Sequence, residues 1–568
     1  MRIDLSRDGL LTPEQAKRLN EVADRTRVHY NDMISRMAIG KEDDLDWWVS
    51  GIAGRNTYVC SLFVECCHVV LIRDLLADQD IAEIVTASRP LAKTIRSVCR
   101  AQGAAVRVVA KESFFEPLKI LWKSAWDCGR DMARQIYRFW LCRIRFPSRK
   151  GPLPANCTLV ELFVLDGSFA AGDFQDRYYE NFGGCLRQEE EKDHVYLANL
   201  AVRFKNLAGT VERLRAATKR FLIQEEILQT SDFVHAWSYP LRCWPLFPRR
   251  ALLSGIDVTP LLRRAWLKHL FSSRSLEAIL KFGLVKRLKK SGATLRLVID
   301  WFENQDMDKA FNMALRRYFP ETAVVGYQGF DTQKYFLCAY PTEVERRSGV
   351  LPHSLAVCGP ALMEERRQFC RDLPVETAPA FRYMNVWRGE TRKTEAPFFR
   401  VLIILPLEAQ SAKEILRLLL EVIEAGPGER VRFFLKPHPA MRLESIYGDV
   451  AHLTSLLKVV GGNISAYWNQ TDLIMGNTSS ALLEAAAMGI PVIVIGSRRG
   501  ITTNPLPESL SGDIWRLAYT KEELLLSLDH FMTSAGKDQK RFAEIGGQIR
   551  DRYFSPVTRT AVLKLLRR

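Results

Sequence analysis

Runs of apolar residues alternate with amphipathic, helix-like stretches along most of this chain. In the first half the runs that predict strands lie at 45–49, 81–86, 105–109, 158–165, 194–198 and 294–299. The pattern predicts helices at 58–76 and 91–102. Parallel strands need a crossover connection, which is usually a helix, so this alternation is typical of a parallel sheet. The pattern therefore predicts an α/β fold.

The second half repeats the pattern after a crossover at 341–360. Strands are predicted at 400–406, 431–435 and 492–495, a helix at 411–425, and further helices after Lys521. We expect two Rossmann-like domains that face each other across a cleft, with the ligand site between them. The expected parts are a helical lead at 1–44, an N-terminal domain at 45–340, a C-terminal domain at 341–535 and C-terminal helices at 536–568.

Two motifs in the second half point to a phosphate site. Lys-Pro-His-Pro at 436–439 follows a predicted strand, and Gly-Asn-Thr-Ser-Ser at 476–480 opens a predicted helix. The start of a helix presents free N–H groups and a positive dipole, which suit an anion. Hydroxyls can cap such a helix, and the imidazole of His438 would add a donor. The motifs predict a seat for a nucleotide monophosphate or diphosphate.

These motifs resemble the C-terminal nucleotide-binding half of GT-B glycosyltransferases. Bacterial sialyltransferases and Kdo transferases, which use CMP-activated acidic sugars, have a His-Pro motif and a Ser/Thr-Ser motif of this kind. The resemblance implies a GT-B fold with helical insertions in the N-terminal half. It implies that the nucleotide is bound by Lys436, His438, Asn477, Thr478, Ser479, Ser480 and Glu484. It further implies an inverting, metal-independent transfer in which the nucleotide sugar is a substrate and no cofactor takes part.

The sequence Trp-Phe-Glu-Asn-Gln at 301–305 resembles an uncharacterised family of bacterial surface-carbohydrate biosynthesis proteins. It follows the predicted strand at 294–299, and open α/β sheets bind their ligands beyond the carboxyl ends of their strands. We therefore expect Glu303 to act as the general base, opposite His438, which would stabilise the leaving phosphate. The residues expected to bind the acceptor are Asn304, Gln305, Arg316 and Gln328.

A second candidate base is Asp166, in Leu-Asp-Gly-Ser at 165–168. This motif is similar to the acidic-acidic-Gly motif of bacterial sialyltransferases, except that Leu165 stands in place of the first acid. Asp173 and Asp176 are weaker candidates. Asp166 could instead cap the next turn, and Glu303 could instead pair with Lys309 or Arg316, so the choice of base stays open.

The chain is basic, with a formal net charge of +16 and a pI near 9.3, which favours an anionic partner. Two helical insertions, at 112–150 and 240–290, mix aromatic residues with cations. In the first, Arg130, Arg134 and Arg138 recur at a four-residue spacing and are expected to share one helix face. Such helices are typical of membrane interfaces. The alternative is a solvated helix whose tryptophans complete the core. Neither insertion resembles a nucleic-acid-binding module.

The twelve cysteines form no CxxC pair, and the chain has no GxGxxG fingerprint or P-loop. No signal peptide and no apolar run long enough to span a membrane is apparent, so we expect a cytoplasmic protein, peripheral on the inner face of the bacterial inner membrane. The function hypothesis is transfer of a nonulosonic acid or Kdo from CMP to lipopolysaccharide or capsule. The alternatives are a UDP-sugar or CDP-glycerol transferase and a non-catalytic scaffold that binds glycan or lipid.

Overall fold

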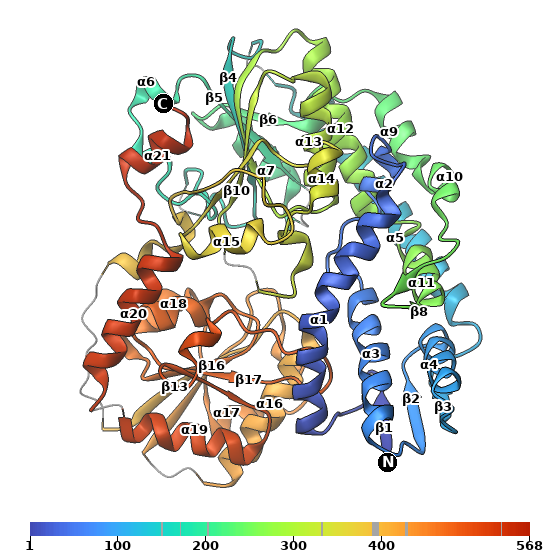
Figure 1. The fold of residues 1–568 in the computed structure, drawn as a ribbon. Coiled ribbons are helices and arrows are strands. Elements are labelled where there is room, and N and C mark those ends of the chain that lie inside the picture. Colours follow the sequence, from blue (N-terminus) through green and yellow to red (C-terminus); the bar gives the residue numbers. More distant parts are fainter. Residues whose placement is uncertain are drawn as a thin grey trace.

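The computed structural model describes residues 1–148, 151–170, 172–200, 204–330, 333–388, 397–426, 430–534 and 537–568. Two large parallel sheets, each covered by helices, lie one above the other in Figure 1. The expected GT-B class of fold, with two Rossmann-like domains and helical insertions in the N-terminal half, is confirmed by this topology.

The sheet of the N-terminal domain has seven parallel strands in the order β12-β11-β10-β9-β4-β5-β6. Its strands are β4 (Cys157–Phe163), β5 (His194–Asn199), β6 (Phe221–Ile223), β9 (Leu295–Trp301), β10 (Ala323–Gln328), β11 (Ser354–Val357) and β12 (Val375–Thr377). After β4 the chain adds β5 and β6 on one side of the sheet. After β9 it adds β10, β11 and β12 on the other side. The crevice beyond the carboxyl ends of β4 and β9 is therefore the topological switch point, where such sheets bind ligands.

The sheet of the C-terminal domain has six parallel strands in the order β15-β14-β13-β16-β17-β18. They are β13 (Phe399–Ile404), β14 (Val431–Lys436), β15 (Lys458–Val459), β16 (Leu473–Gly476), β17 (Val492–Ile495) and β18 (Trp515–Ala518). Here the order reverses between β13 and β16. The switch point of this domain therefore lies beside the two motifs that predicted a phosphate site.

Helices cover both sheets. Those of the N-terminal domain and its insertions are α5 (Glu116–Trp140), α6 (Gln188–Glu191), α7 (Leu207–Ala216), α8 (Gln224–Ile227), α9 (Thr230–Trp237), α10 (Tyr239–Arg242), α11 (Thr259–His269), α12 (Ser273–Lys290), α13 (Asp306–Tyr318), α14 (Glu343–Arg347) and α15 (Ala361–Arg367). Those that follow in the C-terminal half are α16 (Ala409–Glu424), α17 (Val450–Leu456), α18 (Ala481–Ala487), α19 (Lys521–Ser534), α20 (Gln539–Tyr553) and α21 (Arg559–Leu565).

The first 110 residues form a small third unit that the sequence did not predict. Its sheet, in the order β1-β2-β3, contains β1 (Arg2–Leu5), β2 (Glu83–Thr86) and β3 (Arg107–Ala110). Its helices are α1 (Pro13–Ala38), α2 (Leu45–Trp48), α3 (Leu62–Asp78) and α4 (Arg89–Ala101). The expected strand at 45–49 was wrong, because Asp44 caps α2 by accepting the N–H groups of Asp46 and Trp47.

The boundary expected at residue 341 lies inside the N-terminal domain, since β11 and β12 pair with β10 and with each other. The chain enters the C-terminal sheet only at β13. The end of the chain then returns: α21 buries Val562 and Leu565 against the N-terminal sheet, and Arg559 forms an ion pair with Glu190 at 2.5 Å. The N-terminal domain is therefore built from segments that are distant in sequence, as Figure 1 shows.

Helix α1 runs beside both domains (Figure 1). It packs on α3 within its own unit. Its Lys17 pairs with Glu523 at 2.9 Å, and its Asn20 donates to the hydroxyl of Tyr519 at 2.8 Å and accepts the N–H of Thr502 at 2.8 Å. The N-terminal unit therefore contacts the C-terminal domain directly.

A buried carboxylate, that of Glu345, joins four segments of the N-terminal half. Its oxygens lie 2.8 Å from Arg55, 2.8 Å from Lys309, 3.2 Å from Asn304 Nδ2 and 2.8 Å from the N–H of Thr342. Burial alone would raise the pKa of Glu345, but Arg55 and Lys309 outweigh burial and lower it to about 2. The group is therefore ionised at every physiological pH.

Replacing Glu345 by glutamine will destabilise the fold by about 3–5 kcal/mol, because two buried cations lose their common counter-charge. Denaturant unfolding followed by circular dichroism measures this change. Glu343→Gln is the matched control, since Glu343 lies on the same helix but pairs with Arg346 in solvent, where an ion pair contributes about 0–1 kcal/mol. Equal stability of the two variants would contradict a central role for Glu345.

Candidate functional site

The loop that follows β14 presents His438 at the switch point of the C-terminal domain. His438 is partly exposed, and its Nδ1 accepts the N–H of Ala440 at 3.2 Å. Burial lowers the pKa of its imidazole, and the cations Arg177 and Lys436 lower it further. The ring is therefore neutral near pH 7, with its proton on Nε2, so it can donate one hydrogen bond to a ligand.

Lys436, at the end of the same strand, is buried and donates to the carbonyl of Gly462 at 2.6 Å. This hydrogen bond holds the loop at 461–463 against the sheet, and the ammonium has further N–H donors for other partners. Lys436, two residues before His438, thus fixes a neighbouring loop at the switch point.

The second expected motif follows β16 and leads into α18. Asn477 is buried, and its Oδ1 accepts both the N–H of Thr478 at 2.6 Å and the hydroxyl of Thr478 at 3.1 Å. The hydroxyl of Ser479 accepts the N–H of Ala481 at 3.3 Å, whereas Ser480, the N-cap residue of α18, makes no side-chain capping bond. Thr478, Ser479 and Ser480 are all partly exposed. The side chains of these three residues are therefore partly accessible to solvent at the start of α18.

Glu484, one turn into α18, faces the N-terminal domain. Its nearest charged neighbours are Arg382, in the 3-10 helix at Phe381–Trp387 that packs on α18, and Arg177, in the loop that follows β4. Burial raises the pKa of Glu484 to about 7, although both cations oppose this shift. Arg177 also lies near His438. One arginine of the N-terminal domain is therefore close to both the imidazole and the acid of the C-terminal domain.

Arg382 is held by aromatic rings. Its guanidinium lies 5.4 Å from the ring centre of Tyr178 and 5.9 Å from that of Tyr383. Tyr178 in turn packs edge-on against Trp301, with ring centres 4.6 Å apart. This stack connects the cations that face Glu484 with the end of β9, where Glu303 lies.

Glu303 stands just past β9, as expected, with both carboxylate oxygens oriented. Trp301 Nε1 donates to Oε1 at 3.1 Å, and Gln305 Nε2 donates to Oε2. The N–H of Glu303 itself donates to Asp308 Oδ2 at 3.0 Å, and Gln305 N does so at 2.9 Å. The carboxylate is therefore fixed and retains free lone pairs that can accept a proton.

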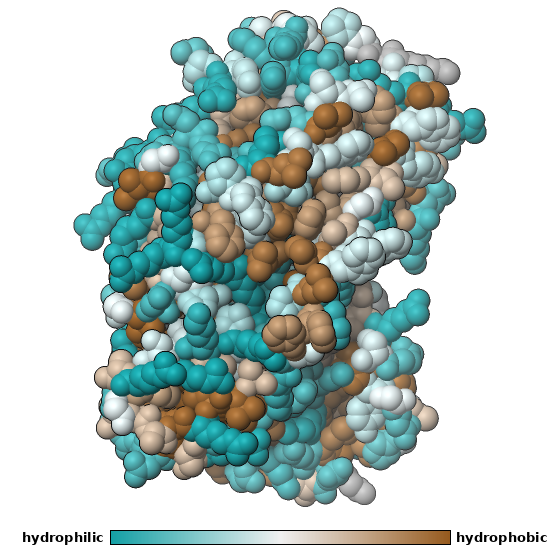
Figure 2. Space-filling view, turned by 90° about the vertical axis from the view of Figure 1, so that its right-hand side faces the viewer, coloured by the Kyte–Doolittle hydropathy of each residue, from teal (hydrophilic) through white to brown (hydrophobic). Residues whose placement is uncertain are grey.

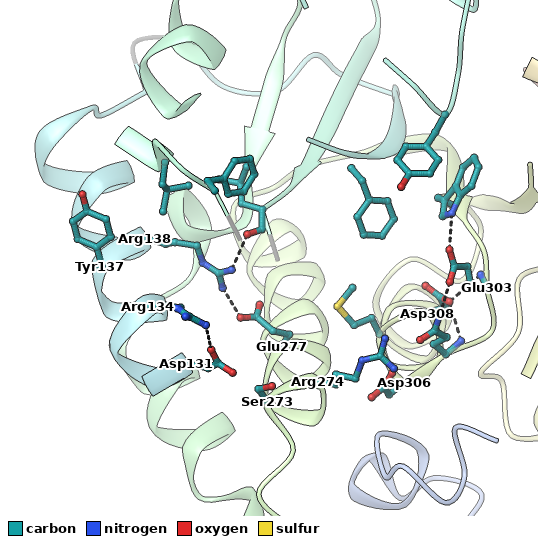
Figure 3. A pocket seen from close by; sticks show the side chains of 18 residues that line it. Asp131, Arg134, Tyr137, Arg138, Ser273, Arg274, Glu277, Glu303, Asp306 and Asp308 are labelled. Carbon is teal, nitrogen blue, oxygen red and sulfur yellow. Dashed lines mark hydrogen bonds and ion pairs between the residues drawn. The ribbon is translucent and has the colours of Figure 1, made fainter. Parts of the chain in front are cut away.

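A cavity of about 740 Å³ opens beside Glu303, beyond the carboxyl ends of β4 and β9 (Figure 3). Glu303, Asp306 and Asp308 line one end. Ser273 and Glu277 of α12 and residues of α5 line the other, and Arg274 of α12 lies beside Asp306. The cavity coincides with the switch point of the N-terminal sheet, so its position agrees with that of ligand sites in open α/β sheets.

Other expected site residues lie elsewhere. Asp166 is exposed, and both its oxygens accept the N–H of Lys205 at 3.1 Å, so it ties two loops together. Asn304 and Gln328 are fully buried; the amide of Gln328 donates to Ala339 O and accepts from Arg366. Arg316 is exposed in the last turn of α13, a helix of 13 residues and about 20 Å, at the end away from Glu303. Of the expected acceptor residues, only Gln305 lines the cavity.

Three buried carboxylates, those of Glu161, Asp300 and Asp308, lie within 4.8 Å of one another beneath Glu303. Lys281 forms an ion pair with Glu161, and Asn312 donates to Asp300 at 2.7 Å. Carboxylate oxygens can bind a hard cation. Here the Lys281 ammonium already supplies a cation, and burial raises the pKa of Asp308 to about 7 and that of Asp300 well above its ordinary value. The group therefore holds protons near neutral pH, and it supports the Glu303 loop through Asp308.

Arg177, Tyr178 and Arg382 were not among the expected site residues. Arg177 and Tyr178 follow β4 at the carboxyl edge of the sheet, the same position that drew attention to Glu303. Asp176, a weaker candidate base, accepts the N–H groups of Tyr178 and Tyr179 at 2.7 and 3.2 Å and so shapes this loop. The strand-end rule could have found Arg177, but no local pattern marks Arg382.

No protein-family model matches the chain, and no curated protein is significantly similar to it. Solved structures match it weakly. A putative UDP-N-acetylglucosamine 2-epimerase from Listeria monocytogenes is 11% identical, with a TM-score of 0.41, over 72% of this chain and 95% of that chain. MurG from Acinetobacter baumannii is 12% identical, with a TM-score of 0.40, over 73% and 99%. The wall teichoic acid polymerase TagF is 9% identical, with a TM-score of 0.38, over 77% and 96%. These values assign the chain to no family.

The raised pKa of Glu484 predicts a pH-dependent stability. In the folded state this group stays protonated up to about pH 7, whereas unfolded glutamate ionises near 4.5. Its contribution to stability is therefore present below pH 4.5 and is lost as the pH rises to about 7. Glutamine does not ionise, so Glu484→Gln removes that loss. The melting temperature of the variant minus that of the natural protein will therefore be larger at about pH 8 than at about pH 5.

Glu421→Gln, at a partly exposed position on α16 of the same domain, is the control and should show no such difference. A melting difference for Glu484→Gln that stays constant between the two pH values would contradict the raised pKa.

Proposed function

We propose that the protein is a glycosyltransferase that moves a sugar from a nucleotide donor to a glycan acceptor. The observation that carries this proposal is the meeting of two switch points at the domain interface. His438 and Glu484 from one domain lie near Arg177 of the other, and a ring stack leads from there to Glu303. A donor and an acceptor can thus be bound by different domains and react between them.

In this mechanism the donor phosphate lies against Nε2 of His438, the hydroxyls of the motif at 478–480 and the Arg177 guanidinium. These donors stabilise the negative charge that develops on the leaving phosphate. In its ionised form, the Glu484 carboxylate accepts hydrogen bonds from the ribose hydroxyls. Glu303, on the opposite side, takes the proton of the acceptor hydroxyl as that oxygen attacks the sugar. The attack from the face opposite the leaving group inverts the anomeric carbon.

The donor we favour is a CMP-linked nonulosonic acid or Kdo, on the strength of the His-Pro and Ser-Ser motifs. A neutral histidine that donates through Nε2 can donate a hydrogen bond to the donor phosphate. A UDP-sugar or CDP-glycerol donor would use the same residues and is the first alternative. A scaffold that binds glycan or lipid without turnover is the second, and the positioned carboxylate of Glu303 speaks against it.

The acceptor we favour is a bacterial surface glycan, lipopolysaccharide or capsule, bound in the cavity beside Glu303. Glu303 and Gln305 form one end of that cavity, and polar and aromatic side chains such as Tyr178 line its wall, which suits a sugar. The proposed enzyme works in the cytoplasm at the inner face of the inner membrane. It needs no metal in this mechanism, because Arg177 supplies positive charge at the phosphate and the neutral His438 supplies a hydrogen-bond donor.

Nucleotide binding tests the donor side. CMP or CDP at a hundred times its dissociation constant will stabilise the natural protein by about 2.7 kcal/mol, and His438→Ala will lose this response without unfolding. A thermal-shift screen of CMP, CDP, UDP and GDP measures it. His452→Ala, an exposed histidine of the same domain, is the matched control and should keep the response. A shift by UDP or GDP alone would remove the CMP assignment.

Turnover tests the base. Glu303→Gln will leave nucleotide affinity almost unchanged and lower kcat by about 10²- to 10⁴-fold, because the amide cannot accept the acceptor proton. Asp166→Asn is the comparison, since Asp166 bonds a backbone N–H outside the cavity and its loss should affect only the local loop. Near-normal turnover of Glu303→Gln would refute this assignment, and a large loss in Asp166→Asn would favour the other carboxylate.

A further inference from the structure

Helix α5 has its apolar side outward. Its only buried residues are Cys128, Gln135 and Arg138. In contrast, Trp122 is 74% exposed and Trp126 is 68% exposed. A helix on the surface of a globular domain normally buries its apolar stripe and exposes its polar residues. The alternative expectation, that these tryptophans complete the core, is therefore wrong.

The exposed apolar residues form one continuous stripe. Phe115, Trp126 and Tyr137 recur at a spacing of eleven residues, which is about three helical turns, so they lie above one another. Leu118, Trp122 and Trp140 point within about 60° of this line, and Ile144 follows in the turn after α5. All of these side chains are exposed. The stripe therefore follows the whole length of α5 and the turn that succeeds it.

Polar contacts hold the inner side of α5. Arg138 forms ion pairs with Glu225 at 2.7 Å and with Glu277 at 2.5 Å, and Gln135 donates to Glu277 at 2.9 Å. Trp237 Nε1 donates to the Gln135 side chain at 2.9 Å. Arg138 is therefore buried, and the expectation that it shares an exposed cationic face with Arg130 and Arg134 is wrong. The inner contacts leave the aromatic stripe with no part in attaching the helix.

Cations flank the stripe. Lys119, Lys123 and Arg130 are exposed, and Arg143 and Arg145 follow at its C-terminal end. Trp244, 61% exposed, and Leu241, 81% exposed, belong to the second basic insertion. Figure 2 shows the side of the molecule on which α5 lies, and hydrophobic side chains gather over its upper half. Within the described residues, no helix combines the length and apolar content needed to cross a bilayer.

We propose that the α5 stripe docks on an anionic lipid bilayer, with α5 lying parallel to the surface. Aromatic rings settle at the level of the lipid headgroups, and the flanking lysines and arginines contact lipid phosphates. This occupant fits better than a second protein, because exposed cations line the stripe on a chain of net charge +16, so two copies placed stripe to stripe would repel.

The same helix forms a wall of the cavity beside Glu303. Asp131, Arg134 and Tyr137 line the cavity, and Tyr137 belongs to both the cavity wall and the stripe (Figure 3). Docking would therefore bring this end of the cavity to the headgroup layer. An acceptor anchored in the same bilayer can then enter beside α5 and reach Glu303, a consequence that rests on the proposed function.

Vesicle co-sedimentation tests the docking without any need for activity. The full chain will sediment with phosphatidylcholine vesicles that contain phosphatidylglycerol at low salt, and only weakly with phosphatidylcholine alone. Trp122→Ser/Trp126→Ser and Lys119→Glu/Lys123→Glu will each weaken binding about tenfold or more. Leu526→Ser, at an equally exposed apolar position on α19, is the control and should bind normally. Undiminished binding by both double variants would overturn the proposal.

Quenching by brominated phosphatidylglycerol separates insertion from adsorption by charge. The natural protein will lose tryptophan fluorescence on these vesicles, whereas Trp122→Phe/Trp126→Phe will still bind but lose most of the quenching. Equal quenching of the two would contradict insertion of the stripe. A concentration-dependent dimer in sedimentation velocity that Trp122→Ser/Trp126→Ser abolishes, without vesicle binding, would replace the bilayer by a second copy. Vesicle binding with no turnover would instead contradict the proposed function and would leave the proposal of membrane docking supported.

Discussion

The carboxylate of Glu345 fixes the backbone on which the candidate base stands. Arg55, Lys309 and Asn304 converge on it from the N-terminal unit, from α13 and from the loop after β9. Asn304, the neighbour of Glu303, has a φ of 56°, a left-handed conformation that non-glycine residues rarely adopt. Its hydrogen bond to Glu345 offsets the cost of this conformation. Because Asn304 turns inward, Glu303 and Gln305 on either side of it turn toward the cavity.

Both sheets obey the same topological rule, and the rule accounts for the location of the site. Each sheet reverses its strand order once, between β4 and β9 in one domain and between β13 and β16 in the other. Side chains that directly follow these strands lie close together whatever the local sequence, because they line the same crevice where the strand order reverses. α1, which contacts both the N-terminal half and the C-terminal domain, and α21, which returns to the first sheet, connect the two domains.

Except at 45–49, the predicted strands were confirmed, because an unbroken apolar run such as 492–495 has few other places to lie. Glu303 was also located at a strand end, and the motif at 476–480 at the start of a helix, from sequence alone. Contacts between distant segments were not predictable. Arg382 reaches Glu484 only through the packing of a 3-10 helix on α18, and β11 and β12 join the first sheet although they follow the expected boundary at 341. The apolar run at 45–49 fits a strand pattern, but it forms a helix because the Asp44 side chain caps its first turn.

Arg138 shows why spacing alone could not sort the cations of α5. Successive residues turn by about 100°, so a four-residue step advances the direction by about 40° and two such steps advance it by about 80°. Arg130 therefore faces solvent, Arg134 lines the cavity and Arg138 is buried against Glu225 and Glu277. Three arginines that seem equivalent in sequence occupy three environments. Reversing the charge of Arg138 would break a buried ion-pair network that holds the helix, so Lys119 and Lys123, which make no such contacts among the described residues, are the informative positions for membrane binding.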